Sequence, residues 1–82
     1  EEFAILLINT NEEGGKLFAE TFRKKIENLV YKKDKIKISV TISIGLTVLK
    51  KEDKSIDDML YRADEALYIS KENGRNRVST KL

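Results

Sequence analysis

Hydrophobic and polar positions alternate in different ways along the chain, and each pattern predicts a different element. Residues 3–8 are apolar without interruption and are followed by the turn-forming run Asn9-Thr10-Asn11. A run of this length suits a β-strand buried on both faces, although periodicity alone does not separate it from a turn of buried helix. Such strands usually lie inside a sheet covered by helices. The chain is therefore expected to open with an interior strand, an unusual place for a domain to begin.

The next segment, to about Val30, has the spacing of an amphipathic helix. Its apolar side chains recur three and four residues apart, at Phe18, Phe22, Ile26, Leu29 and Val30. Thr10 and Glu13 have the order of a capping box, in which a hydroxyl and a carboxylate satisfy free N–H groups of the first turn. Gly14 and Gly15 weaken that turn, because each glycine costs about 1 kcal/mol relative to alanine.

Residues 36–48 alternate between apolar and polar, which is the period of a β-strand. One face carries Ile, Val and Leu side chains, and the other carries small or polar ones. Gly45 lies on the second face and indicates a bulge or the close approach of another backbone.

A second amphipathic helix is expected after the charged turn at 50–54. Ser55 and Asp58 form its candidate capping box. One apolar stripe then follows at Ile56, Met59, Leu60, Ala63, Ala66 and Leu67. Gly74 is expected to end this helix in a left-handed conformation, and residues 76–80 are expected to form a short strand. The predicted order is β-α-β-α-β, which is an α/β chain.

Two further side chains of the second helix are given structural roles. Asp64 is expected to pair with Arg62 or Lys71, and Tyr68 is expected to join the apolar stripe in the core.

Composition narrows the chemistry that this chain can perform. Its 82 residues include no His, Cys, Pro or Trp. Disulfides, Cys/His zinc sites, thiol catalysis and Ser-His-Asp hydrolases are thereby excluded. A chain of this length hides only about 60–65% of its unfolded surface, so we expect a thin core. No apolar run approaches the roughly 20 residues of a membrane span, and the acidic start is unlike a signal peptide.

Charge adds little to this picture. The net charge of +2 is too small to indicate a nucleic-acid partner. Basic residues gather between 23 and 37, and a basic stretch can follow a phosphate backbone. The stretch lacks the interleaved aromatic pattern of single-strand binders. We therefore interpret it as a solvated helix end and surface loop, and expect no nucleic-acid partner.

Three stretches together resemble one family. Residues 1–3, Glu-Glu-Phe, resemble the end of the Gly-Gly-Glu-Glu-Phe signature of GGDEF domains, the diguanylate cyclases. Residues 40–45 resemble a later strand of that family. Residues 62–68 with Lys71 and 74–76 resemble its last helix and the turn that follows. These motifs occur in family order over almost the whole chain, which makes the resemblance specific.

The resemblance implies that residues 1–82 are the C-terminal half of one GGDEF domain. Residue 1 corresponds to a position inside the signature, and Ala19-Glu20 with Arg23 weakly matches the intervening helix. The implied fold is the palm-like, ferredoxin-like nucleotide cyclase fold, a mainly antiparallel sheet flanked by helices. Its N-terminal half would supply the glycine pair, the guanine-reading residues and the product-inhibition site. It would also supply a first strand, with an acidic metal ligand, between 4–8 and 40–48.

The same resemblance implies an activity and a set of site residues. The parent protein would join two GTP molecules into cyclic di-GMP with release of pyrophosphate, as a homodimer that uses Mg²⁺ or Mn²⁺. Divalent cations of this kind take hard oxygen ligands and neutralise phosphate charge. Glu1 would be a catalytic acid and metal ligand, Glu2 a second catalytic acid, and Lys71 and Arg75 would bind GTP phosphates. Apart from the resemblance, the simpler interpretation is that the two glutamates are solvated acids at the start of the chain. Lys71 and Arg75 are then ordinary cations favoured by the negative end of a helix dipole.

Two other functions stay open. A degenerate GGDEF domain would bind GTP, cyclic di-GMP or a partner protein without turnover. An unrelated ferredoxin-like module would bind RNA in a salt-sensitive way. The isolated chain is expected to be inactive in every case, because most metal ligands and guanine-reading residues would lie upstream. For the parent we expect an upstream sensor or regulatory domain and a cytoplasmic location, with any membrane tether upstream of residue 1.

Overall fold

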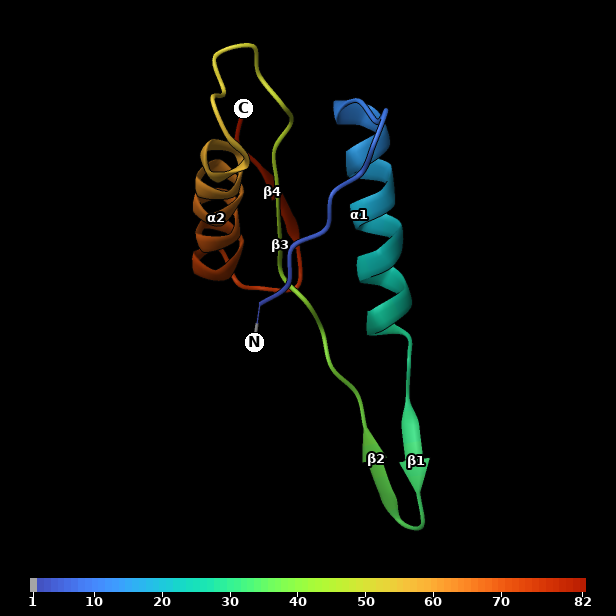
Figure 1. Cartoon of the computed structure of the whole chain (residues 1–82). Helices are drawn as coiled ribbons and strands as arrows, with labels where there is room; N and C mark the ends of the chain where they lie inside the picture. Colours follow the sequence, from blue (N-terminus) through green and yellow to red (C-terminus); the bar gives the residue numbers. More distant parts are fainter. Residues whose placement is uncertain (1) are drawn as a thin grey trace.

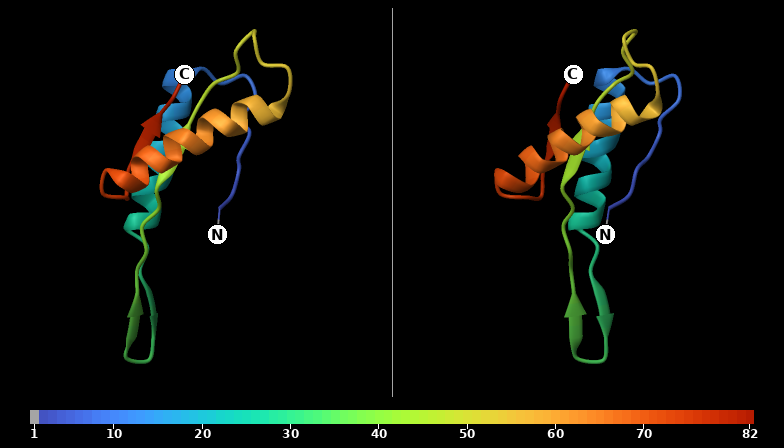
Figure 2. Two further views of the ribbon diagram at one scale, coloured as in Figure 1. Left: turned by 90° about the vertical axis from the view of Figure 1, so that its left-hand side faces the viewer. Right: turned by 60° about the vertical axis from the view of Figure 1, so that its left-hand side comes forward.

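A computed structural model describes residues 2–82. Its elements, in order, are helix α1 (Glu12–Glu27), strands β1 (Tyr31–Lys33), β2 (Ile36–Ile38) and β3 (Ile44–Leu46), helix α2 (Ile56–Glu72) and strand β4 (Val78–Thr80). Strands β3 and β4 lie between the two helices, and the β1–β2 hairpin projects away from this body (Figure 1). Two further views show the same arrangement (Figure 2). The α/β class predicted from the sequence is confirmed.

The strands form two small sheets. Strands β1 and β2 pair antiparallel, with Lys32 opposite Lys37. Strands β3 and β4 pair parallel, from Ile44 opposite Val78 to Leu46 opposite Thr80. Parallel neighbours need a long crossover connection, and here α2 provides it. The described part of the predicted sheet is therefore one antiparallel pair and one parallel pair.

Residues 3–8 do not form the predicted strand. The segment has no regular secondary structure, and Phe3 and Ile8 are 87% and 78% exposed. A strand needs a hydrogen-bonded neighbour, because its backbone N–H and C=O groups have no partners within the segment. Within residues 2–82, no strand pairs with this segment. The prediction of a buried strand is thus wrong for the described chain, since the pairing surface that it needs is missing there.

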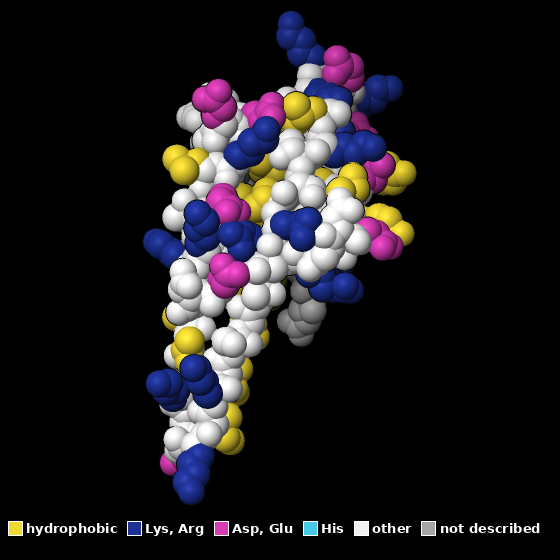
Figure 3. All heavy atoms as spheres, turned by 180° about the vertical axis from the view of Figure 1, so that it is seen from behind, with side chains coloured by type: hydrophobic (Ala, Val, Ile, Leu, Met, Phe, Trp, Pro, Cys, Tyr) yellow, Lys and Arg dark blue, Asp and Glu magenta, His cyan; other side chains and the backbone are white. Residues whose placement is uncertain are grey.

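The long alternating strand predicted over 36–48 is divided. Its first part pairs in the hairpin as β2, its last part forms β3, and residues 39–43 lie between them outside any ladder. The hairpin itself was not predicted. Its turn places Asp34 at a φ of 56°, and a positive φ is what a two-residue hairpin turn requires. Lys and Arg side chains gather at this end of the molecule, with apolar side chains along one edge of the hairpin (Figure 3).

The N-cap of helix α1 lies one residue later than predicted. Asn11 is the N-cap, and its Oδ1 accepts a hydrogen bond from the Gly14 N–H at 2.8 Å. Thr10 instead donates its hydroxyl to the Ile8 carbonyl oxygen at 3.1 Å. The amide oxygen of an asparagine accepts from a free N–H of the first turn as well as a hydroxyl oxygen does. The predicted capping box on Thr10 is therefore wrong, although the helix starts within one residue of the expected position.

Helix α2 has the predicted bounds but an altered cap. Ser55 occupies the N-cap position and makes no side-chain capping hydrogen bond within the described residues. Asp58 accepts a hydrogen bond from the Lys54 N–H at 2.8 Å, one residue before the expected donor. At the other end Gly74 has a φ of 117°, so the predicted left-handed stop is confirmed.

Arg62 ties the start of α2 to the preceding loop. Its guanidinium makes two hydrogen bonds of 2.7 Å to the carboxylate of Asp53. It also donates to the Val48 carbonyl oxygen at 2.8 Å and to the Thr47 hydroxyl at 3.0 Å. The side chains of Arg62 and Asp53 are only 13% and 5% exposed. The predicted pair with Asp64 is wrong, because Arg62 reaches back to the loop.

Gly45 allows α2 to lie directly on β3. A Cβ at this position would overlap the Ala63 carbonyl oxygen and the Leu67 nitrogen of α2. Beside it the Ser70 hydroxyl donates to the Ile44 carbonyl oxygen at 2.8 Å and bonds the Ser79 hydroxyl at 2.7 Å. The predicted close approach of another backbone at Gly45 is thus confirmed.

The core is thin, as expected for this length. Its buried described side chains are small, namely Ala19, Ala66 and Ser70. Tyr68 is 63% exposed, so its predicted place in the core is wrong. The face of α2 that contacts β3 carries the small residues, which turns Tyr68 outward. Within residues 2–82 neither helix is long and apolar enough to cross a lipid bilayer.

Replacing Gly45 with alanine is expected to destabilise the chain. The added methyl group meets helix backbone, which cannot rotate away, so we expect a loss of about 1–3 kcal/mol in the free energy of unfolding. Urea unfolding followed by circular dichroism measures it. Gly14→Ala is the control, because its Cβ contacts only side chains of Thr10 and Asn11 and alanine favours the helix. Equal stability of Gly45→Ala and the parent sequence would contradict this packing.

Acid is expected to weaken the anchor of α2 through Asp53. Hydrogen bonds from Arg62 first, and from the Lys50 N–H second, lower the pKa of Asp53 from 3.8 to about 2. Because the pKa is lower in the folded state, ionised Asp53 stabilises the fold above its unfolded value. This contribution is lost as the pH falls from 3.8 through about 2.

Urea midpoints at a series of pH values test this. The Asp53→Asn variant should be less stable than the parent sequence at neutral pH, and the difference should shrink across that acid range. A difference that is the same at neutral pH and at pH 2 would show that Asp53 does not carry this dependence.

Candidate functional site

A largely apolar groove opens between the N-terminal segment and β3. Its volume is about 930 Å³. Residues 2–5 and 7 line one wall, and residues 41–46 line the other. Phe18 and Phe22 of α1 lie along it with stacked rings, 6.1 Å between centroids. Both rings are more than a third exposed. The groove therefore leaves apolar surface open to solvent between two backbone segments.

Charged side chains from distant parts of the sequence share this groove. Glu2, Asp64, Lys71 and Arg75 all contribute to its lining. The Lys71 ammonium donates a hydrogen bond to the Glu2 carboxylate at 3.0 Å, and their side chains are 41% and 58% exposed. An exposed pair of this kind adds little to stability. It does bring the acidic start of the chain to the last turn of α2.

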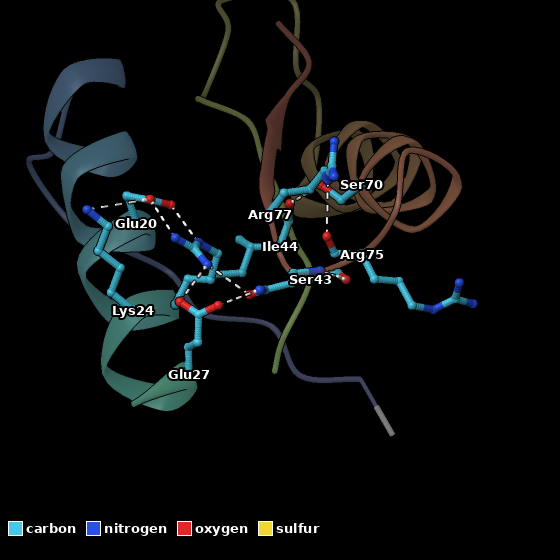
Figure 4. A network of polar contacts seen from close by, with 10 residues as sticks. Glu20, Lys24, Glu27, Ser43, Ile44, Ser70, Arg75 and Arg77 are labelled. Carbon is cyan, nitrogen blue, oxygen red and sulfur yellow. Dashed lines mark hydrogen bonds and ion pairs between the residues drawn. The ribbon is translucent and has the colours of Figure 1, made fainter. Parts of the chain in front are cut away.

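Arg75 lies in the turn that follows α2. Gly74, Arg75 and Asn76 have φ values of 117°, 63° and 49°, so three successive residues are left-handed. The Arg75 N–H donates to the Ser70 carbonyl oxygen at 2.9 Å, which closes the end of the helix. The Arg75 side chain is exposed and extends away from the neighbouring polar network (Figure 4).

A polar network on the α1 side holds the same turn (Figure 4). Arg23 binds the carboxylate of Glu20 with two hydrogen bonds of 2.7 and 2.8 Å. It also donates to the Asn76 Oδ1 at 2.8 Å, and the Asn76 amide donates to Glu27 at 2.7 Å. Hydrogen bonding from Arg23 lowers the pKa of Glu20 and bonding to Glu20 raises the pKa of Arg23. Both groups are therefore charged near neutral pH.

Sequence reasoning did not identify this network. In the sequence Arg23 belongs only to the weak match with the family's intervening helix, and Asn76 belongs to the motif after the second helix. Their contact spans 53 positions in the sequence. The one available signal was that both positions carry side chains able to make several hydrogen bonds beside a glycine stop.

The predicted site residues are placed as follows. Glu2, Lys71 and Arg75 lie at the groove, and Glu2 and Lys71 are in contact. Glu1, predicted as the metal ligand, lies outside the described residues. The expected pair of Asp64 with Lys71 is wrong, because Lys71 binds Glu2.

The described residues do not form a divalent-cation site by themselves. Carboxylates suit Mg²⁺ and Mn²⁺, but no three acidic side chains come together within residues 2–82. The carboxylate of Glu2 is already paired with Lys71. A metal at this end of the groove would need ligands beyond those that the structure describes.

Comparisons with known proteins agree with the motifs. The family model described as "Diguanylate cyclase, GGDEF domain" matches residues 1–77. Diguanylate cyclase A of Treponema denticola is 44% identical over 79 residues, which cover 96% of this chain and 21% of that protein. Diguanylate cyclase VdcA of Vibrio cholerae is 40% identical over 81 residues, covering 95% and 24%. Diguanylate cyclase DgcM of Escherichia coli is 38% identical over 82 residues, covering 95% and 18%.

The chain spans about a fifth of the length of these curated relatives. The alignments nevertheless cover almost all of the chain, and the family model covers the segment from the N-terminal motif through the turn after α2. Motif order, α/β architecture and these matches lead to one conclusion. The chain belongs to the GGDEF domain family, the family of diguanylate cyclases in cyclic di-GMP signalling.

Proposed function

We propose that residues 1–82 are the C-terminal half of a catalytic GGDEF domain. The protein that carries them condenses two GTP molecules into cyclic di-GMP and releases pyrophosphate. The observation that carries this proposal is the meeting of Glu2, Lys71 and Arg75 at one groove. These residues come from the two motifs at opposite ends of the family match. An acid beside two cations is the arrangement that a metal-bound nucleotide needs.

Lys71 and Arg75 bind the GTP phosphates in this proposal. Arginine offers a planar fork for phosphate oxygens, and lysine offers a mobile point charge. The pair between Lys71 and Glu2 is open to solvent, so a triphosphate can replace Glu2 at the ammonium. Binding would then leave the Glu2 carboxylate without its cation, at the position where the family places a catalytic acid.

The reaction itself is a nucleotidyl transfer in which two nucleotides face each other. The 3′-oxygen of each GTP forms a bond to the α-phosphorus of the other, and the bond to the pyrophosphate leaving group breaks. The proton of each attacking hydroxyl leaves in that step, and Glu1 and Glu2 are the carboxylates to which the family motif assigns this role. Each domain presents one GTP, so the active form is a homodimer.

Further features of the parent protein follow from this assignment. We propose Mg²⁺ or Mn²⁺ as cofactor, held by Glu1 together with ligands outside the described residues; such a cation neutralises phosphate charge. The substrate GTP is a cytoplasmic metabolite, so the domain works in the cytoplasm. A sensor or regulatory domain lies upstream. The 82 residues alone are inactive, because they hold too few ligands for a metal and none of the family's guanine-reading positions.

The groove supports the proposal that the other half of the domain packs here. Its two walls are the segments that contain residues 2–5 and 7 and residues 41–46, and its surface is mostly apolar. Neighbouring strands lie about 4.8 Å apart, so two strands that bracket a third are roughly 10 Å apart. A strand from upstream would pair with both walls and cover residues such as Phe3 and Ile5, which are now exposed.

Hydrogen exchange can test this packing. In the longer protein the amides of residues 3–7 and 41–43, which lie outside any ladder in the isolated 82-residue chain, should exchange far more slowly than in that chain, because a ladder protects its N–H groups. Amides of the β1–β2 hairpin serve as the control and should exchange alike in both proteins. Equally fast exchange of residues 41–43 in the two proteins would show that the groove is not filled.

Activity of the longer protein tests the function. Incubation with GTP and Mg²⁺ should yield cyclic di-GMP by mass spectrometry, and Glu1→Ala should abolish it. Lys71→Ala should raise KM for GTP about 10- to 100-fold, the effect of losing a charged hydrogen bond. Lys81→Ala is the matched control, because Lys81 pairs with Glu65 at 3.0 Å instead of lining the groove.

Two other results would change the assignment. Binding of GTP or cyclic di-GMP without any product would identify a degenerate receptor domain. Salt-sensitive RNA binding with indifference to GTP would identify an unrelated module.

A further inference from the structure

The turn after α2 is held in a conformation that its residues seldom adopt. Gly74 tolerates its φ of 117° because it has no Cβ, but Arg75 and Asn76 follow it with φ values of 63° and 49°. Asparagine enters this region more readily than most residues, and arginine does so rarely. Left-handed backbone of this kind persists when surrounding contacts determine it, and it is concentrated at functional sites.

Asn76 provides those contacts. Its Oδ1 accepts from Arg23 at 2.8 Å and its amide donates to Glu27 at 2.7 Å. Its own N–H donates to the Ser43 hydroxyl at 3.2 Å. These partners belong to α1 and to the segment before β3, so the turn is fastened to two separate parts of the fold.

Arg23 is itself fixed. Two hydrogen bonds to Glu20 and a longer one of 3.4 Å to Glu27 surround its guanidinium. Its side chain is 12% exposed. The charge of Arg23 is therefore balanced by two carboxylates of its own helix. Its guanidinium also donates a hydrogen bond to Asn76. This arrangement suits a rigid support and does not suit a ligand for phosphate.

Arg75 has the opposite character. Its backbone is fixed by the hydrogen bond to Ser70 and by its neighbour Asn76. Its side chain is exposed and extends away from the network (Figure 4). Because the Cα of Arg75 is held in place, its exposed guanidinium can reach only a limited region. Such pre-orientation of a binding group reduces the entropy lost on binding.

We propose that Arg23 and Asn76 are positioning residues that hold Arg75 in its left-handed conformation, so that its guanidinium meets the GTP phosphates beside Lys71. The inference rests on the proposed function, because it gives Arg75 a phosphate to bind. Neither positioning residue touches the nucleotide in this arrangement. Their effect passes through the backbone of the turn.

A double-mutant cycle in the longer protein tests the proposal. The variants are Asn76→Ala, Arg23→Gln, Arg75→Ala and each of the first two combined with Arg75→Ala. KM and kcat for GTP with Mg²⁺ are measured, together with the affinity for inorganic triphosphate by calorimetry. Asn76→Ala and Arg23→Gln should each raise KM about 10- to 100-fold, the effect of a misplaced binding group.

The combined variants distinguish positioning from a general structural role. In the Arg75→Ala background, Asn76→Ala and Arg23→Gln should cause little further change in KM or triphosphate affinity, because residues that act as a unit are not additive. Fully additive effects in both backgrounds would overturn the proposal, since they would reflect a loosened fold. Lys16→Ala is the control on the same helix, because Lys16 pairs with Glu12 outside this network and its side chain is 53% exposed, and it should leave KM unchanged.

Two safeguards keep the outcome interpretable. Asn76→Gly permits the left-handed backbone without the side-chain hydrogen bonds, and should raise KM less than Asn76→Ala while preserving the fold by circular dichroism. If Arg75→Ala alone leaves triphosphate affinity unchanged, the phosphate role of Arg75 fails and the positioning proposal fails with it. If Arg75→Ala weakens binding while Arg23→Gln and Asn76→Ala do not, the positioning proposal alone is overturned.

Discussion

The direct packing of α2 on β3 is the constraint on which the rest of the molecule depends. Gly45 removes the side chain that would keep the two backbones apart, and Ser70 joins them through the Ile44 carbonyl oxygen. This contact fixes the direction of α2, and with it the last helical turn that carries Lys71 and the turn that carries Arg75. It also sets the path by which β4 returns to lie parallel to β3. The candidate phosphate-binding cations are thus placed by a contact between small residues.

A consequence is that the large apolar side chains contribute little to the core of the described chain. Ala19, Ala66 and Ser70 are buried, whereas Phe18 and Phe22 stand over the groove. Packing of small residues brings backbones close and gains dispersion energy, but it buries little apolar area. Part of the apolar surface that this sequence could bury therefore remains exposed along the groove, at residues such as Phe3, Ile5 and Phe18. The proposed upstream half would cover it, which links the stability of the domain to the assembly of its site.

Local patterns in the sequence predict both helices. Features that depend on pairing between distant segments are not predictable from such patterns. The bounds of α2 and the role of Gly45 follow from periodicity and from one missing side chain. Residues 3–8 have the composition of a buried strand, but composition does not supply a partner strand. The network of Arg23 with Asn76 joins positions 53 apart, which no single-sequence pattern reveals. The candidate site was reached through the family motifs, and Glu2 and Lys71 do meet, whereas Glu1 lies outside the described residues.

The β1–β2 hairpin bears on how such a chain avoids aggregation. Its ladder places Lys32 directly opposite Lys37, and like charges in that relation repel. Ile36 and Ile38 are 62% and 50% exposed. The unpaired edges of a short apolar hairpin of this kind can pair with further strands. Each added strand from another copy would bring more lysines beside the first pair. The same repulsion that weakens the hairpin therefore disfavours the addition of strands from other copies at its edges. The groove then remains the place where another strand can pair.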